Sequence, residues 1–186
     1  MERALCFLKK YAPAVLFIAL ILLVDQLVKN WAVASLPGNR ITVIENVFYL
    51  TFATNSGAAW NLLSGSRGVL LLVSIAAFGL IFYIFKAGWI TTAVQRWCMY
   101  AVIGGALGNL FDRIFRPDGL VIDLFDFQLI HFPIFNVADI FISVGGVLFI
   151  LCFLRANLHG APLKPDSAGG TLDIPSNPGE DRHDQA

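Results

Sequence analysis

The side chains in this sequence that best suit chemistry by type and position are aspartates. Asp25, Asp112 and Asp139 each lie inside or at the end of a long apolar run, and Asp123 and Asp126 lie between two such runs. Two carboxylates that share one proton can activate water, because one takes a proton from the water while its protonated partner polarises a carbonyl group. The sequence therefore predicts acid–base hydrolysis.

Other hydrolytic mechanisms lack the residues that they need. The sequence has three histidines and three cysteines, at His131, His159, His183, Cys6, Cys98 and Cys152. Their spacing fits neither an HExxH zinc site nor a CxxC motif, and an odd number of distant cysteines argues against a disulfide scaffold. A Ser–Lys hydrolase would need Lys29, and nothing pairs it with Ser56 or Ser64.

The composition identifies an integral membrane protein. Of the 186 residues, 57% are hydrophobic and 14% are charged, with a mean hydropathy of +0.71, whereas soluble domains carry about a quarter charged residues. Thirteen Lys and Arg balance thirteen Asp and Glu, which excludes nucleic-acid binding driven by net basic charge. Four stretches are predicted to cross the bilayer as helices, at about residues 11–31, 68–85, 93–111 and 135–154.

The orientation of these helices places the aspartates. With the N-terminus in the cytoplasm, eight of the thirteen basic residues fall on the cytoplasmic side, which favours both termini inside. Asp25, Asp112 and Asp139 then lie near the external surface, and Asp123 and Asp126 lie in the external loop between the third and fourth helices. Ionisable groups within spans usually face a polar interior, so these acids form the candidate site.

The first helix and the segments outside the spans complete the predicted fold. The first helix begins like a cleaved signal peptide, but Asp25 and Lys29 precede the small-residue site, so we expect it to be retained. Residues 40–44 and 47–53 are β-branched and aromatic, which predicts a small external hairpin or sheet. An extended substrate can add to its edge; the alternative is a lid without substrate contact. We predict an all-α membrane protein with four transmembrane helices and this hairpin within residues 1–159, followed by a disordered cytoplasmic tail at 160–186.

Small residues predict how the helices pack. Gly104 and Gly108 form a GxxxG pattern in the third helix, and Gly145 and Gly146 lie in the fourth. Small residues let membrane helices approach closely. We expect packing within the chain rather than a dimer interface.

Five motifs follow one another along the chain. They are DQLVK at 25–29, NSGAA at 55–59, GGALGNLFDR at 104–113, VID at 121–123 and FNVAD at 135–139. Together they resemble the motifs of bacterial lipoprotein signal peptidases (signal peptidase II), and the resemblance covers about residues 10–157. One departure is Trp60, where this family usually has Phe after Gly-Ala-Ala, which affects the expected shape of the substrate pocket.

The resemblance implies a function and roles for single residues. The family cuts lipid-modified prolipoproteins just before the diacylglyceryl cysteine, and it uses two aspartates. By position, Asp123 and Asp139 are the catalytic pair, and Asp126 is not part of it. The residues that match positions for substrate or globomycin binding and for support of the pair are Asn55, Gly57, Asn109, Asp112, Arg113, Asn136 and Ala138. Asp25 and Lys29 match a structural motif.

Several of these residues have simpler interpretations. Asp25 and Lys29 are spaced i,i+4, which also suits an intrahelical ion pair. Asp112 and Arg113 also suit a cap and an ion pair at a helix end. Asn55 also suits the cap of a turn.

The sequence thus predicts a metal- and cofactor-free aspartyl endopeptidase. We expect a monomer in the bacterial cytoplasmic membrane, with its active site on the periplasmic side, acting on lipid-modified prolipoproteins among membrane lipid and binding no nucleic acid. One alternative is a proton- or cation-coupled carrier that uses Asp25 and Asp139, although carriers place such acids near the bilayer midplane and often show internal repeats. Another is a non-catalytic membrane subunit that binds a partner through the external sheet.

Overall fold

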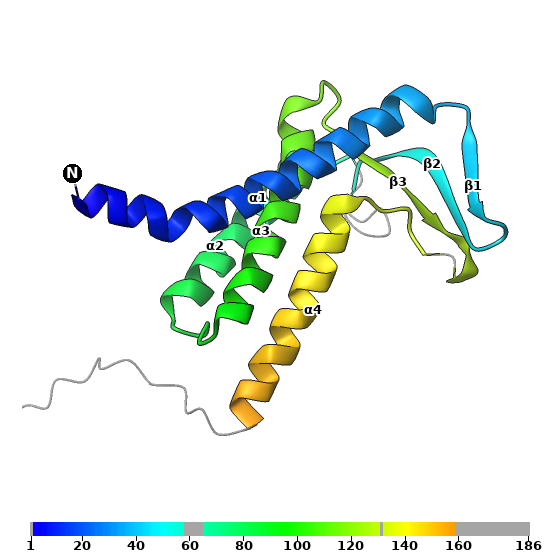
Figure 1. Ribbon diagram of the computed structural model, residues 1–186. Helices are drawn as coiled ribbons and strands as arrows, with labels where there is room; N and C mark the ends of the chain where they lie inside the picture. Colours follow the sequence, from blue (N-terminus) through cyan, green and yellow to red (C-terminus); the bar gives the residue numbers. More distant parts are fainter. Residues whose placement is uncertain (1, 58–64, 131, 159–186) are drawn as a thin grey trace, which may run out of the picture.

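Four long helices and one small antiparallel sheet make up the fold of the computed structural model (Figure 1). The structure describes residues 2–57, 65–130 and 132–158, so the predicted tail at 160–186 and Trp60 lie outside the described residues. The elements are α1 (Glu2–Ser35), β1 (Arg40–Ile44), β2 (Phe48–Asn55), α2 (Arg67–Lys86), α3 (Ala93–Phe115), β3 (Val121–Phe127), the short 3₁₀ helix η2 (Gln128–Ile130) and α4 (Val137–Leu158). The sheet lies beyond the C-terminal end of α1.

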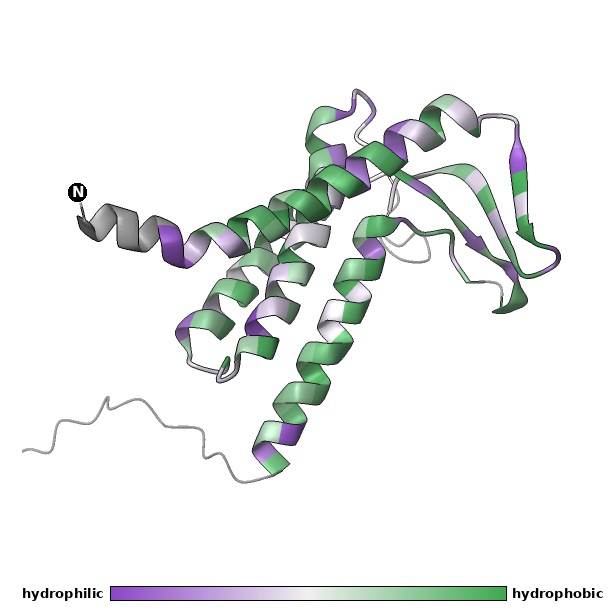
Figure 2. Ribbon diagram, viewed as in Figure 1, coloured by the Kyte–Doolittle hydropathy of each residue, from purple (hydrophilic) through white to green (hydrophobic). Residues whose placement is uncertain are grey.

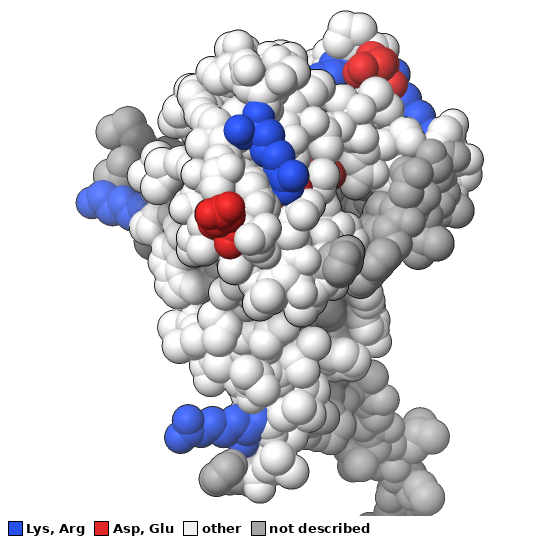
Figure 3. Space-filling view, turned by 90° about the vertical axis from the view of Figure 1, so that its right-hand side faces the viewer, with Lys and Arg blue, Asp and Glu red and all other residues white. Residues whose placement is uncertain are grey.

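Three of these helices are long and apolar enough to cross a membrane. The spans are Lys9–Ser35 of α1, Arg67–Lys86 of α2 and Val137–Leu158 of α4. Large apolar side chains such as Leu16, Leu72 and Ile150 are exposed on their surfaces, and Figure 2 shows apolar residues all along α2 and α4. Figure 3 shows charges of both signs on the face that carries the sheet and a wide uncharged surface below it. Lipid is the environment that such surfaces need.

The third helix differs from the expectation of a fourth span at 93–111. It forms over Ala93–Phe115, but among the described helices it does not reach the apolar character of the other three. The polar side chains that lower its hydropathy are Gln95, Arg96, Asn109, Asp112 and Arg113. Several of them are buried against neighbouring elements, because α3 packs against α1, α2 and α4. Polar side chains of membrane helices usually face other helices or a polar interior rather than lipid.

Close approach between α3 and its neighbours depends on glycine. A Cβ on Gly104 would lie 3.0 Å from the side chain of Ile21 on α1. A Cβ on Gly105 would overlap the carbonyl oxygen of Ala138 at the start of α4, and a Cβ on Gly145 would lie 2.8 Å from the carbonyl oxygen of Cys98. These glycines therefore serve packing within the chain, as the sequence predicted, whereas no atom lies within 4 Å of a Cβ added at Gly146.

The predicted hairpin forms, and the structure adds a third strand to it. β1 and β2 pair antiparallel, and their turn contains Asn46, whose φ of 60° lies in the left-handed region that Asn tolerates. β3 pairs antiparallel with β2 and gives the order β1-β2-β3. Asp123 was expected in a loop, but it lies on this strand, opposite Ala53.

The alternation of side chains along β3 explains why this strand forms where a loop was expected. Ile122 and Leu124 are buried against Ala32 and Leu36 at the end of α1, in the core that joins the sheet to the helices. Because successive side chains of a strand point to opposite faces, Asp123 points away from that core.

Candidate active site

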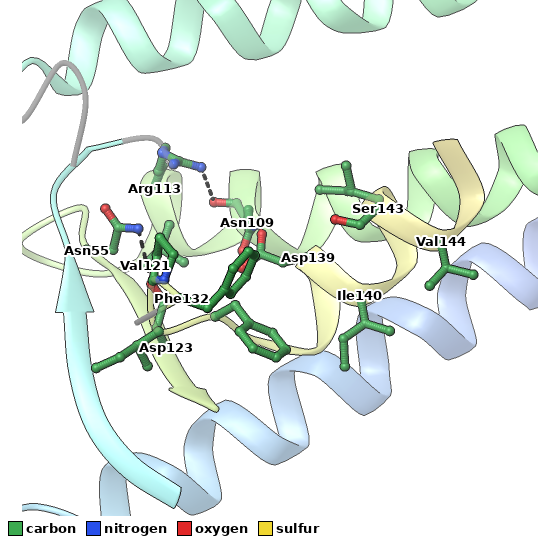
Figure 4. A pocket seen from close by; sticks show the side chains of 14 residues that line it. Asn55, Asn109, Arg113, Val121, Asp123, Phe132, Asp139, Ile140, Ser143 and Val144 are labelled. Atoms are coloured by element: carbon green, nitrogen blue, oxygen red, sulfur yellow. Dashed lines mark hydrogen bonds between the residues drawn. The ribbon is translucent and has the colours of Figure 1, made fainter. Parts of the chain in front are cut away.

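A cavity of about 460 Å³ lies where α3, α4 and the sheet meet (Figure 4). Its polar lining comes from β2, α3, β3 and α4, and consists of Asn55, Asn109, Arg113, Asp123, Asp139 and Ser143. An apolar wall includes Val121, Phe132, Phe135, Ile140 and Val144. The last two follow Asp139 along α4 and remain exposed on the surface of that helix. The cavity thus joins a polar end to an apolar, membrane-facing side.

Strand β3 delivers Asp123 to the cavity. Val121 and Asp123 share the face of the strand that lines it, whereas Ile122 and Leu124 pack into the core. The backbone N–H groups of Leu124 and Phe125 donate to the carbonyl oxygen of Phe135, at 3.0 Å and 2.8 Å. These bonds fasten the segment before α4 to the strand, so that Asp123 lies beside the start of that helix.

The first turn of α4 fixes Asp139. The backbone N–H of Asp139 donates to Oδ1 of Asn136 (3.0 Å), and the backbone N–H of Asn136 donates to Oδ2 of Asp139 (3.1 Å). This reciprocal pair has the form of a capping box, which satisfies amide groups that a helix leaves free at its N-terminus. The sequence Phe-Asn-Val-Ala-Asp thus places a carboxylate at the cavity and caps its helix with the same residues.

Two asparagines connect the carboxylates. Nδ2 of Asn136 donates to Oδ1 of Asp123 at 2.6 Å and to Oδ1 of Asn109 at 3.1 Å. Nδ2 of Asn109 in turn donates to Oδ1 of Asp139 at 2.7 Å. Asn136 is completely buried, so these bonds are shielded from water, and the two carboxyl groups belong to one hydrogen-bonded unit.

Burial gives Asp123 an unusual acidity. The residue is 3% exposed. Its burial, and next the negative charge of Asp139, raise the pKa of Asp123 from 3.8 to about 7, although hydrogen bonds from Asn55 and Asn136 act in the opposite direction. Near neutral pH the pair therefore holds a proton that two exposed carboxylates would release, which allows acid and base chemistry at one site.

Asn55 and Arg113 line the cavity, and Gly57 contacts both of them without lining it. Nδ2 of Asn55 donates to Oδ2 of Asp123 at 3.1 Å, and its Oδ1 accepts from the N–H of Gly57 at 2.8 Å, so this residue both caps a turn and contacts Asp123. Arg113 donates to the carbonyl oxygens of Gly57 (3.0 Å) and Asn109 (3.3 Å). Ala58, Ala59 and Trp60, which follow in the same motif, lie outside the described residues.

The remaining motif residues lie behind the cavity. Lys29 forms ion pairs with Asp25 and with Asp112, both at 2.8 Å, and all three side chains are completely buried. The expected i,i+4 ion pair is present, but it is part of a cluster that joins α1 to α3. Asp112 pairs with Lys29 and with Arg116 (2.9 Å), rather than forming the expected ion pair with Arg113. The N–H of Ala138 donates to Oδ1 of Asp25 at 2.9 Å.

Asp126 serves the sheet instead of the cavity. It lies three residues after Asp123, and an odd separation puts the two side chains on opposite faces of β3. Arg40 forms an ion pair with Asp126 at 2.9 Å, and Gln128 donates to it at 3.0 Å. Asp126 does not line the cavity, and the choice of Asp123 over Asp126 as a catalytic residue stays a prediction.

Sequence reasoning missed Gln26, Arg116 and Ser143. Gln26 donates to Asp25 (3.2 Å), next to it in the chain, and to Asp112 (3.1 Å). Arg116 follows Asp112 by four residues, a spacing that would have indicated this ion pair. Ser143 follows Asp139 by four residues and therefore lies on the same side of α4.

The described residues contain no group of three His, Cys, Asp or Glu side chains that could hold a metal ion. The expectation of chemistry without a metal or an organic cofactor is not tested by this observation, and it stays a prediction.

Known proteins are similar to this chain in sequence and in fold. A family model described as Signal peptidase (SPase) II matches residues 17–155. A lipoprotein signal peptidase from Latilactobacillus sakei is 39% identical over 136 residues, which cover 73% of this chain and 89% of that protein. One from Trichormus variabilis is 38% identical over 152 residues, which cover 75% and 85%.

A solved structure agrees with these matches. A bacterial membrane enzyme, determined by the in meso method at 2.3 Å resolution, has a TM-score of 0.71 and 27% identity, over 80% of this chain and 91% of that one. The stretch matched by the family model contains every residue that lines the cavity. This chain therefore belongs to the signal peptidase II family and is a membrane peptidase.

Proposed function

We propose that this chain is an aspartyl endopeptidase that removes the signal peptide from lipid-modified prolipoproteins, with Asp123 and Asp139 as its catalytic pair. The observation that carries the proposal is the single cavity that both carboxyl groups line, where Asn136 hydrogen-bonds each of them. The names of the relatives support the substrate class, since they are lipoprotein signal peptidases.

The proposed reaction uses the shared proton. Asp139 takes a proton from a water molecule whose oxygen bonds to the carbonyl carbon of the scissile peptide, while Asp123 gives its proton to the carbonyl oxygen. The resulting diol collapses when the C–N bond breaks: one hydroxyl returns a proton to Asp123, and the leaving nitrogen takes the proton held by Asp139. The pKa of Asp123, raised to about 7, supports the acid role because the group keeps its proton up to neutral pH.

Arg113 and Asn55 hold the substrate backbone in this proposal. Both line the cavity beside Asp123, and both carry N–H groups that can donate hydrogen bonds to a peptide carbonyl oxygen. Arg113 is itself held by the carbonyl oxygens of Gly57 and Asn109, so its position is defined before a substrate arrives.

The apolar side of the cavity suits a substrate that arrives through the membrane. Ile140 and Val144 line the cavity and are also exposed on α4, a candidate membrane span. A signal peptide helix could therefore enter sideways from lipid and present the bond before its lipidated cysteine to Asp123 and Asp139. We infer that the chain acts as a monomer in the cytoplasmic membrane, with both termini in the cytoplasm and the cavity on the periplasmic side.

Product analysis tests the proposal. The purified protein is incubated with a diacylglyceryl-modified prolipoprotein and, in parallel, with the same precursor without lipid. We expect cleavage of the lipidated precursor alone, with a free signal peptide and a product that begins at the modified cysteine, both identified by mass. An intact lipidated precursor would contradict the proposal and would favour a carrier or a non-catalytic subunit.

A further inference from the structure

Lys29 uses all of its hydrogen-bonding capacity inside the protein. Its side chain is completely buried, and its Nζ lies 2.8 Å from Oδ2 of Asp25, 2.8 Å from Oδ2 of Asp112 and 2.9 Å from Oδ1 of Asn109. An ammonium group has three N–H donors, and each one has a partner here. Lys29 does not line the cavity, so any effect on the reaction passes through these three residues.

The third contact decides how the Asn109 amide is turned. Oδ1 of Asn109 accepts from Lys29 and from Nδ2 of Asn136, and Nδ2 of Asn109 donates to Oδ1 of Asp139. An ammonium group can only donate, so the amide oxygen must face Lys29. The amide is planar, and its NH₂ group is thereby directed at Asp139.

A second connection leads from the same cluster to the start of α4. Lys29 contacts Oδ2 of Asp25, and Oδ1 of that carboxylate accepts from the backbone N–H of Ala138, the residue before Asp139. The cluster carries no net charge, because Lys29 and Arg116 balance Asp25 and Asp112. An i,i+4 ion pair that served only α1 would need neither the bond to Asn109 nor the one to Ala138.

We propose that Lys29 is a positioning residue for the peptidase reaction: by holding Oδ1 of Asn109, it directs the amide N–H of that residue at the carboxylate of Asp139. The inference rests on the proposed function. Without Lys29 the amide can turn over, and its oxygen would then face a carboxylate instead of donating to it.

Lys29→Met tests the proposal, because methionine keeps much of the length but has no donor. We expect kcat to fall about 10- to 100-fold and KM to stay within about twofold, since Lys29 does not line the cavity. The alkaline limb of the pH profile should move to higher pH. Asp139, Arg113 and Lys29 are among the charged groups that act on Asp123, and loss of Lys29 removes a cation that favours the ionised form of Asp123.

A second variant separates this role from folding. Lys29→Met/Asp25→Asn restores charge balance, leaves the Asp112–Arg116 pair intact and keeps an acceptor for Ala138 N–H, but does not restore the donor to Asn109. We expect its Tm in detergent and the pH limb to return toward those of the unchanged protein, because the anion beside Lys29 is removed as well, while kcat remains that of Lys29→Met. Recovery of kcat together with Tm would overturn the positioning role.

The same assay distinguishes the two proposals. If the unchanged protein does not cut a lipidated precursor, the proposed function is wrong. If the unchanged protein cuts it, and Lys29→Met retains kcat per folded molecule and an unshifted pH limb, only the positioning role is wrong.

Discussion

Asn136 donates a 2.6 Å hydrogen bond from its side-chain amide to Asp123, and this contact ties the strand that carries one carboxylate to the helix that carries the other. The same residue caps α4 by exchanging hydrogen bonds with Asp139. One buried asparagine therefore sets the relation between the two acids.

Asn136→Ser should separate the two tasks of this residue. Serine is a good N-cap, so we expect the thermal stability in detergent to stay close to that of the unchanged protein. Its shorter side chain does not reach Asp123, and kcat should fall about 100-fold. Asn136→Ala should lose the same activity and, in addition, about 0.5–2 kcal/mol of stability with the cap. Equal activity in Asn136→Ser and the unchanged protein would contradict the role of the bond to Asp123.

Asp123→Asn and Asp139→Asn should each lower kcat by about 1,000-fold or more, because each removes a group that gives or takes a proton. Asp126→Asn is the matched control on the same strand, since this side chain pairs with Arg40 on the other face of the sheet. It should keep kcat within about threefold and lose no more than about 1 kcal/mol of stability. A loss in Asp126→Asn as large as that in Asp123→Asn would reverse the assignment of the two acids.

The rate should fall as the pH rises through about 7. The proposed reaction needs one proton on the pair of carboxyl groups. Because the pKa of Asp123 is raised to about 7, that proton is lost as the pH rises through this value. A profile of kcat/KM between pH 5 and 9, on a neutral lipidated substrate, measures this limb. A rate that stays constant up to pH 9 would exclude Asp123 as the acid.

The same carboxyl group makes a prediction for stability. The pKa of Asp123 is higher in the folded chain than the ordinary 3.8. The folded state therefore binds more protons than the unfolded state between about pH 4 and 7. Stability from this group is therefore fully present below about pH 4 and declines as the pH rises to about 7. In Asp123→Asn the decline should be smaller, and Tm measured at pH 5 and pH 8 tests this difference.

Gly108→Ala should loosen the packing that supports the site. A Cβ at Gly108 would lie 2.6 Å from Oδ2 of Asp25 and 3.2 Å from the Cβ of Ala138, so α3 would have to move away from both. We expect a loss of about 1–3 kcal/mol in stability, with reduced activity. Gly146→Ala is the control, because no atom lies within 4 Å of its added Cβ. Equal Tm values for the two variants would show that the contact at Gly108 is not limiting.

The sequence determined the features that depend on local pattern. Apolar runs predicted α2 and α4, and the β-branched segments predicted β1 and β2. The choice of Asp123 and Asp139 came from the resemblance of the five motifs to those of the signal peptidase II family, and it stays a prediction. These signals are readable because helix length, strand alternation and capping depend on residues within a few positions of one another.

Only the tertiary structure decided the rest. β3 was expected to be a loop, since its hydrogen-bonding partner β2 lies some 70 residues earlier in the chain. Lys29 contacts Asp112 and Asn109, which lie about 80 positions later in the chain. The pKa of Asp123 depends on its burial and on the charge of Asp139. The energy of interaction between buried charges depends on the distances between them and on the exclusion of water. Both are set only when the chain packs.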